Sequence, residues 1–335
     1  MLKNKISSVI IEKTVKSHWN LLEINLRTSV RNFLIDLVIK LVNDEATANQ
    51  NQFLINKLDI VIVAIAKNEW TTTWLTFISD LCQSAKYNQN ICNNNMKILQ
   101  LFSEEINTFW KDSLTSKKAK ELKEKMSKEF LEVLSICQYV FDNSQSVNQS
   151  LLQESLKLFA EYTIWFPINY VLDQKILSQF FTDIKRGNNA TQIEIIKCLG
   201  KIASIRFDEE TNQEYFNVKA AVMEIFKNLL IEATNMVKGQ NIVENSKVNP
   251  TLEKFCLELE MAIISFFQVN FKFIEQNDFV NGTCNGNNFT NNFGQTIVQG
   301  LTYMQEFLKF QNEEIFKAAC EFWFWFTFKV AILSD

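Results

Sequence analysis

Apolar side chains recur every three or four positions along most of the chain, which is the spacing of one face of an α-helix. Between residues 30 and 41 this stripe consists of Val30, Phe33, Leu34, Leu37, Val38 and Leu41. The same period returns over residues 91–109, 152–166 and 193–203, each time with polar residues on the other side of the predicted helix. The pattern predicts an all-α protein.

Short polar breaks separate these segments into predicted helices of about 15 to 25 residues, and successive helix pairs begin about 40 to 50 residues apart. That period is typical of HEAT and armadillo arrays, so we predict a single HEAT-type α-solenoid of about seven pairs. The predicted pairs are residues 1–20 (a partial pair), 21–68, 70–112, 116–166, 169–207, 212–275 and 292–334 of the solenoid 1–335. The Asn- and Gly-rich residues 279–292 are predicted to form a flexible surface insert.

The composition supports a helical fold. The chain has 335 residues but only seven Gly and two Pro, well below the roughly 7% and 5% of average usage. All-β folds need many tight turns, and Rossmann or P-loop folds need Gly beside phosphate, so this scarcity disfavours them. The hydrophobic content of 47% disfavours disorder, because that much apolar surface can offset the entropy lost on folding.

The net charge and the cysteines limit which partners the chain is expected to bind and which cellular compartment it is expected to occupy. The formal net charge is -4, whereas nucleic-acid binders normally present a basic field, so we expect no direct binding to nucleic acid. The most apolar segment, residues 322–333, is interrupted by Lys329 and is shorter than the roughly 20 residues of a membrane-spanning helix. No membrane span is therefore predicted. The seven Cys residues form no CxxC pair and indicate a reducing compartment.

The sequence offers no constellation typical of catalysis or metal binding. Because His18 is the one histidine, a two-histidine metal site is excluded. Neither GxGxxG nor P-loop spacing occurs. Adjacent carboxylates such as Glu104 and Glu105 lie on different sides of a helix and make poor acid/base pairs. We therefore expect no enzyme activity, no cofactor and no metal.

A tryptophan-containing segment carries a family resemblance. Residues 67–80 read Lys-Asn-Glu-Trp-Thr-Thr-Thr-Trp-Leu-Thr-Phe-Ile-Ser-Asp and resemble the Glu-Trp-Pro-x-x-Trp-Pro-x-Phe-Ile-x-Asp hallmark of the exportin-1-like karyopherins. The positions that the resemblance implies to be structural are Trp70, Trp74, Phe77 and Asp80, while Thr71 and Leu75 replace the two prolines of the family. Further similar segments follow in the same order, at residues 91–105, 136–145, 165–170 and 197–203, and finally at 314–317 with 320–323.

This resemblance implies the N-terminal portion of a nuclear export receptor, a non-catalytic scaffold that works in the nucleus, in the cytoplasm and at the nuclear pore. It implies Ran in its GTP form as a partner of the concave second helices, and Phe-Gly nucleoporins as partners of the outer face. Cargo with a leucine-rich export signal would bind only if downstream repeats are present, because the family's export-signal groove lies in later repeats. The residues predicted to contact Ran are Lys57, Asn94, Lys97, Gln100 and Glu104.

The aromatic C-terminal helix is the reverse of the polar cap that ends most solenoids. We expect Phe322, Trp323, Trp325 and Phe326 to form an exposed stacking end that a further repeat or a partner covers. The chain alone is predicted to aggregate or associate through this end.

Two other functions remain open. A general HEAT-repeat scaffold that assembles other subunits, without a transport role, shares the helical period but not the matches at residues 70–80 and 91–105. An α-helical enzyme with cysteine-based chemistry would reveal itself by one thiol of lowered pKa among the seven.

Overall fold

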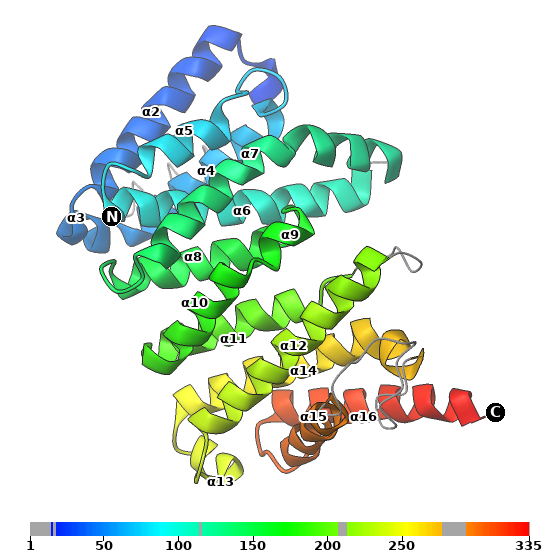
Figure 1. The fold of residues 1–335 in the computed structure, drawn as a ribbon. Helices are drawn as coiled ribbons and strands as arrows, with labels where there is room; N and C mark the ends of the chain where they lie inside the picture. The colour runs from blue at the N-terminus through cyan, green and yellow to red at the C-terminus, as the bar shows by residue number, and fades with distance from the viewer. Residues whose placement is uncertain (1–14, 16–17, 114–115, 207–212, 277–292, 335) are drawn as a thin grey trace. The chain divides into compact units, whose positions relative to one another are not determined.

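The computed structural model describes residues 15, 18–113, 116–206, 213–276 and 293–334 of the chain. Every element within these ranges is a helix (Figure 1). The prediction of an all-α, HEAT-like helical stack is confirmed. The insert predicted at residues 279–292 lies outside the described residues. No described helix combines the length and the apolarity needed to cross a membrane.

The chain divides into two compact units, residues 1–167 and 168–335. The elements of the first unit are η1 (Trp19–Leu21), α2 (Ile24–Val42), α3 (Glu45–Gln50), α4 (Gln52–Glu69), α5 (Phe77–Ser84), α6 (Gln89–Ser113), α7 (Ser116–Asp142) and α8 (Gln149–Tyr162). The second helices of successive pairs, α4, α6 and α8, pack side by side, and the first helices α5 and α7 pack together. Two layers of helices result, with the apolar faces between them.

The second unit repeats this arrangement. Its elements are α9 (Ile168–Val171), α10 (Gln174–Arg186), α11 (Asn189–Ala203), α12 (Gln213–Met236), α13 (Ile242–Ser246), α14 (Pro250–Gln276), α15 (Phe293–Phe307) and α16 (Glu313–Ser334). The helix α14 packs against α11 on one side and α16 on the other, while α12 packs against α10 and α15. The largest buried side chains of this core are aromatic, and Phe226 stacks on Phe266 with ring centroids 3.6 Å apart.

Asparagine and aspartate side chains begin many of these helices. In each case the side-chain oxygen accepts a hydrogen bond from the backbone N–H three residues later. These residues are Asp44, Asn88, Asn148, Asp173, Asn188, Asn241, Asn249 and Asn312. Such a cap stabilises a helix by about 1 kcal/mol relative to alanine. Much of the Asn-rich composition therefore serves to set where helices begin.

The aromatic run of α16 is divided between core and surface, and this corrects the predicted stacking end. Phe322 is 1% exposed and lies 5.6 Å from the Phe267 ring of α14, so it belongs to the core. Trp323, Trp325 and Phe326 are half-buried. Consecutive residues of a helix point about 100° apart, and α14 and α15 both cover α16 on one side. The most exposed aromatic residues are instead Phe324 and Phe328, at 78% and 60%.

Glu260 of α14 is a buried carboxyl that has no hydrogen-bond partner among the described residues. The residue is fully buried, and neither carboxylate oxygen accepts a hydrogen bond from the part of the chain that the structure describes. Burial, with a smaller contribution from Glu314 of α16, raises the pKa of Glu260 to about 8. The carboxyl is therefore protonated at neutral pH, which avoids the much larger free-energy cost of burying an unpaired charge.

Candidate functional site

The second helices of the first unit carry the residues predicted to contact a partner. In α6 the apolar stripe faces the interior, since Ile98, Leu99 and Phe102 are each at most 2% exposed. Polar side chains of the same helix bind α4 on one side and α8 on the other. The surface of this layer is therefore built from three helices with defined lateral contacts.

Asn94 and Asp59 form a buried polar pair between α6 and α4. Nδ2 of Asn94 donates to Oδ1 of Asp59 at 3.1 Å, and both residues are at most 5% exposed. Burial raises the pKa of Asp59 to about 7, although the Asn94 hydrogen bond and the Lys97 charge both act to lower it. The sequence pattern predicted that Asn94 lies on the partner-facing surface. In the structure Asn94 is buried, and its amide donates a hydrogen bond to the buried carboxyl of Asp59.

Two further polar contacts join neighbouring second helices. Nε2 of Gln100 donates to the backbone oxygen of Glu154 on α8 at 3.1 Å and to its carboxylate at 3.2 Å. Lys67, near the end of α4, pairs with Glu105 of α6 at 2.9 Å. Because each contact spans two helices, it holds the lateral register of the layer on which the predicted partner would bind.

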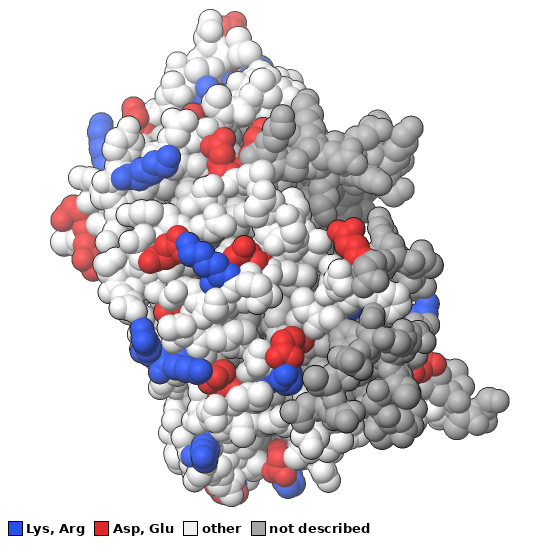
Figure 2. Space-filling view, viewed as in Figure 1, with Lys and Arg blue, Asp and Glu red and all other residues white. Residues whose placement is uncertain are grey.

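Among the predicted contact residues, Lys57, Lys97 and Glu104 reach the surface of this layer. Lys57 and Lys97 are half-buried, and Glu104 is exposed. In the face shown in Figure 2, acidic and basic side chains are interspersed and do not gather by sign.

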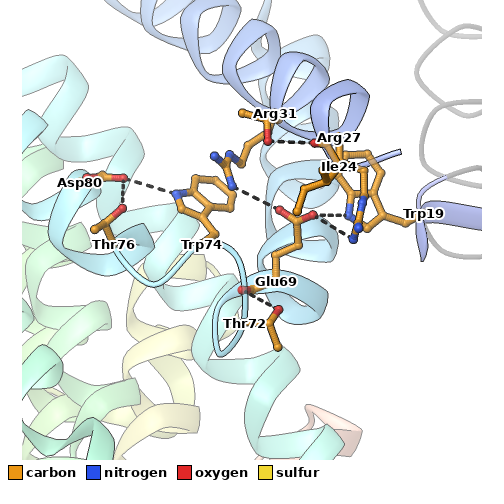
Figure 3. A network of polar contacts seen from close by, with 10 residues as sticks. Trp19, Ile24, Arg27, Arg31, Glu69, Thr72, Trp74, Thr76 and Asp80 are labelled. Carbon is orange, nitrogen blue, oxygen red and sulfur yellow. Dashed lines mark hydrogen bonds and ion pairs between the residues drawn. The ribbon is translucent and has the colours of Figure 1, made fainter. Parts of the chain in front are cut away.

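The carboxylate of Glu69, at the end of α4, is the centre of a polar network (Figure 3). It accepts a hydrogen bond from Nε1 of Trp19 at 3.0 Å and pairs with Arg27 at 3.5 Å and Arg31 at 3.3 Å. The Arg31 guanidinium also lies over the Trp74 ring, 4.7 Å from its centroid, which is favourable for a cation. The network ties η1 and α2 to the loop that follows α4.

The four residues of the tryptophan motif are structural anchors of this region. Nε1 of Trp74 donates to Asp80 at 3.3 Å. Nε1 of Trp70 donates to Glu129 of α7 at 2.8 Å. Phe77 is fully buried, and its ring and that of Trp70 each lie 4.8 Å from the ring of Phe102. The two tryptophans therefore keep anchoring contacts although Thr71 and Leu75 follow them in place of proline.

A groove of about 830 Å³ lies between the first helices α5 and α7. Its floor includes Cys82, Cys92 and Ile136, and its rim includes Lys86 and Tyr139. Tyr139 is 65% exposed. An apolar floor with a polar rim is the form of a site for a small apolar group or side chain.

Among the described residues, four buried cysteines are not activated as nucleophiles, and no group of side chains is arranged to bind a metal ion. Burial raises the pKa of Cys92 to about 11 and that of Cys256 to about 12, and it raises the pKa of Cys82 and Cys198 further. None of these four thiols is therefore activated as a thiolate. Among the residues that the structure describes, no three His, Cys, Asp or Glu side chains are grouped so as to hold a metal ion.

Sequence reasoning missed Arg27, Arg31 and Asp59 as members of the polar clusters. The spacing of the two arginines by four residues places them on one helix face, and this signal could have paired them with the acidic Glu69 of the motif. Asp59 stands between Leu58 and Ile60 in an apolar run, which is a sequence signal for a buried carboxyl. Neither pattern names the partner residue, since that depends on packing between helices.

Residues 51–199 match the family model described as Exportin 1-like protein. The protein EXPORTIN 1B of Arabidopsis thaliana is 28% identical over 317 residues, which make up 94% of this chain and 27% of that protein. Exportin-1 of Drosophila melanogaster is 28% identical over 323 residues, with the same two shares. Exportin-1 of Dictyostelium discoideum is 31% identical over 235 residues, 67% of this chain and 21% of that protein.

The chain thus spans about a quarter of the length of these relatives, and the similarity falls on their N-terminal portion. A non-catalytic role agrees with this similarity. Because the similarity extends over 94% of the sequence, the chain belongs to the exportin-1 family.

Proposed function

We propose that this chain is the Ran-binding part of a nuclear export receptor and that it binds Ran in its GTP form. The observation that carries the proposal is the match of 94% of the chain to the N-terminal portion of exportin-1 relatives. The resemblance to exportin-1-like karyopherins implies that the second helices of this portion contact Ran. The chain contributes shape and side chains, and no chemical step is involved.

The contact surface in this proposal is the outward side of α4 and α6. Lys57, Lys97 and Glu104 offer charges to the partner, and Gln100 lies among them at the edge facing α8. Asn94 lies beneath this surface, where its hydrogen bond to Asp59 joins α6 to α4. A rigid layer lowers the entropy lost on binding, because the lateral contacts already fix the positions of these side chains.

Further partners follow from the same family membership. We place Phe-Gly nucleoporins on the first helices, where the groove between α5 and α7 has room for an aromatic side chain. Binding of cargo with a leucine-rich export signal would require repeats beyond those of this chain. The proposed sites of action are the nucleus, the cytoplasm and the nuclear pore.

A pull-down with Ran loaded with GTP or GDP tests the proposal. We expect retention of the GTP form, and we expect Lys97→Glu to reduce it at least about tenfold because a charge in the contact surface is reversed. Lys40→Glu, the same change on the exposed side of α2, is the matched control and should leave retention unchanged. Equal or absent retention of both forms would instead favour a general HEAT-repeat scaffold.

A further inference from the structure

A second groove lies between α10 and α12, two helices of the second unit that run side by side (Figure 1). Its volume is about 500 Å³, within the roughly 300 to 1,000 Å³ of ligand pockets. The lining extends from Gln174 to Arg186 on α10 and from Ala221 to Glu232 on α12, which is about three turns of each helix. All of these residues belong to the middle of the sequence and to one compact unit.

The floor of this groove is apolar. Leu177 of α10 and Ile225 of α12 line it and are each 4% exposed. Phe181 is half-buried, so part of its ring faces the groove. Ala221, which is also half-buried, brings only a methyl group to the floor. The floor can therefore bury an aliphatic side chain of a partner.

One end of the groove has an uncompensated positive charge. Lys185 and Arg186 are both exposed at the end of α10, and Lys185 pairs across the groove with Glu232 at 3.1 Å. The other acidic residue of the lining, Glu224, pairs with Lys227 at 2.7 Å. Arg186 has no hydrogen bond or ion pair within the described residues. Its planar guanidinium is suited to bind a carboxylate through two parallel hydrogen bonds.

We propose that this groove binds an extended acidic peptide of a partner protein, with an aliphatic side chain on the floor and a carboxylate on Arg186. Phe181 and Arg186 are five residues apart, which is about 7.5 Å along the helix. An extended peptide rises about 3.3 Å per residue, and its alternate side chains point to the same side. The aliphatic and the acidic residue should therefore be two positions apart. The proposal is independent of Ran binding.

The charges of the lining decide between the possible occupants. A basic peptide would be repelled by Arg186, and a neutral peptide would leave its guanidinium without a partner. An acidic peptide compensates the one charge that the chain leaves open, because Glu224 and Glu232 are already paired. The new pair would lie at the rim, partly in water, so raising the salt concentration should weaken binding.

Fluorescence polarisation of a labelled peptide, Gly-Ser-Leu-Ser-Asp-Gly, titrated with about 1 to 300 µM of the full chain, tests the proposal. We expect saturable binding. Replacing the aspartate of the peptide by asparagine, or its leucine by serine, should weaken binding at least about tenfold. Arg186→Glu should have an effect of the same size. Lys254→Glu, the same change at an exposed position of α14, is the matched control and should leave the constant unchanged.

A charge exchange tests the direct contact with Arg186. A peptide with lysine in place of the aspartate should bind Arg186→Glu more tightly than the unaltered chain, because the pair is rebuilt with its signs reversed. Ala221→Gln should abolish binding of the original peptide, since a longer side chain would fill the floor without removing a packed group. Absence of binding up to about 300 µM would overturn the proposal. Equal binding of the asparagine peptide, or binding unaffected by Arg186→Glu, would overturn it as well.

Discussion

Replacing Glu260 by glutamine should raise the free energy of unfolding of the second unit, by an amount that depends on pH. The pKa of Glu260 is raised to about 8 in the folded chain, from an ordinary value of 4.5, mainly because the residue is fully buried. Between these two values the unfolded chain releases a proton that the folded chain keeps. The free energy of unfolding therefore falls as pH rises from about 4.5 to about 8, and it is level above that.

The size of the effect follows from the same shift. Each pKa unit corresponds to about 1.4 kcal/mol, and about 2.5 units lie between the ordinary value and pH 7, so the upper bound at pH 7 is about 3.5 kcal/mol. Relaxation and water entry reduce such effects, and we expect about 2 to 3 kcal/mol. Glutamine has nearly the same shape and is not charged, so the variant should lose this pH dependence.

Urea unfolding at pH 5, 6, 7 and 8, followed by circular dichroism, measures the difference between the chain and Glu260→Gln. The difference should be small at pH 5 and grow steadily to pH 8. Glu258→Gln, on the same helix, is the matched control. Its carboxylate pairs with Lys197 at 3.4 Å on the surface, so its effect should stay below about 1 kcal/mol. A difference for Glu260→Gln that is the same at all four pH values would refute the reasoning.

Two further substitutions test the packing and the polar network. Gly200→Ala should lower the free energy of unfolding by about 1 to 3 kcal/mol, because the new Cβ would lie 2.6 Å from Cβ of Ala262 and 3.2 Å from its Cα. Unfolding in urea measures this change, and an unchanged midpoint would contradict the close approach of α11 and α14. Glu69→Gln should destabilise the first unit by about 2 to 4 kcal/mol, because Arg27 and Arg31 lose their shared carboxylate. Thermal unfolding measures this loss, and a stabilised variant would contradict the role given to Glu69.

The fold could be predicted from the sequence because its signals are local. Helical periodicity, scarce Gly and Pro, and short polar breaks each act within a few residues, and together they predict an all-α repeat protein. The asparagines in the polar breaks also cap helices. This signal is local as well, because an asparagine directly before a helix start is a preferred N-cap residue. Asn148 and Asn188 are two examples.

The site could be predicted only in part, because burial depends on contacts between helices. Asn94 and Lys97 both lie on the polar side of the same sequence pattern, but Asn94 is 5% exposed because Asp59 of α4 faces it. Phe322 and Phe324 belong to one aromatic run, and the packing of α14 decides that the first is buried and the second is 78% exposed. A single sequence contains the residues of such pairs but not their distances.

The proposal that the second helices of the first unit bind Ran is tested most directly by isothermal titration of the chain with Ran in each nucleotide state. The account predicts at least about tenfold tighter binding of the GTP form than of the GDP form, a difference of about 1.4 kcal/mol or more. It also predicts that Lys97→Glu removes this preference while Lys40→Glu keeps it. Equal affinities for the two forms, or a preference unaffected by Lys97→Glu, would contradict it.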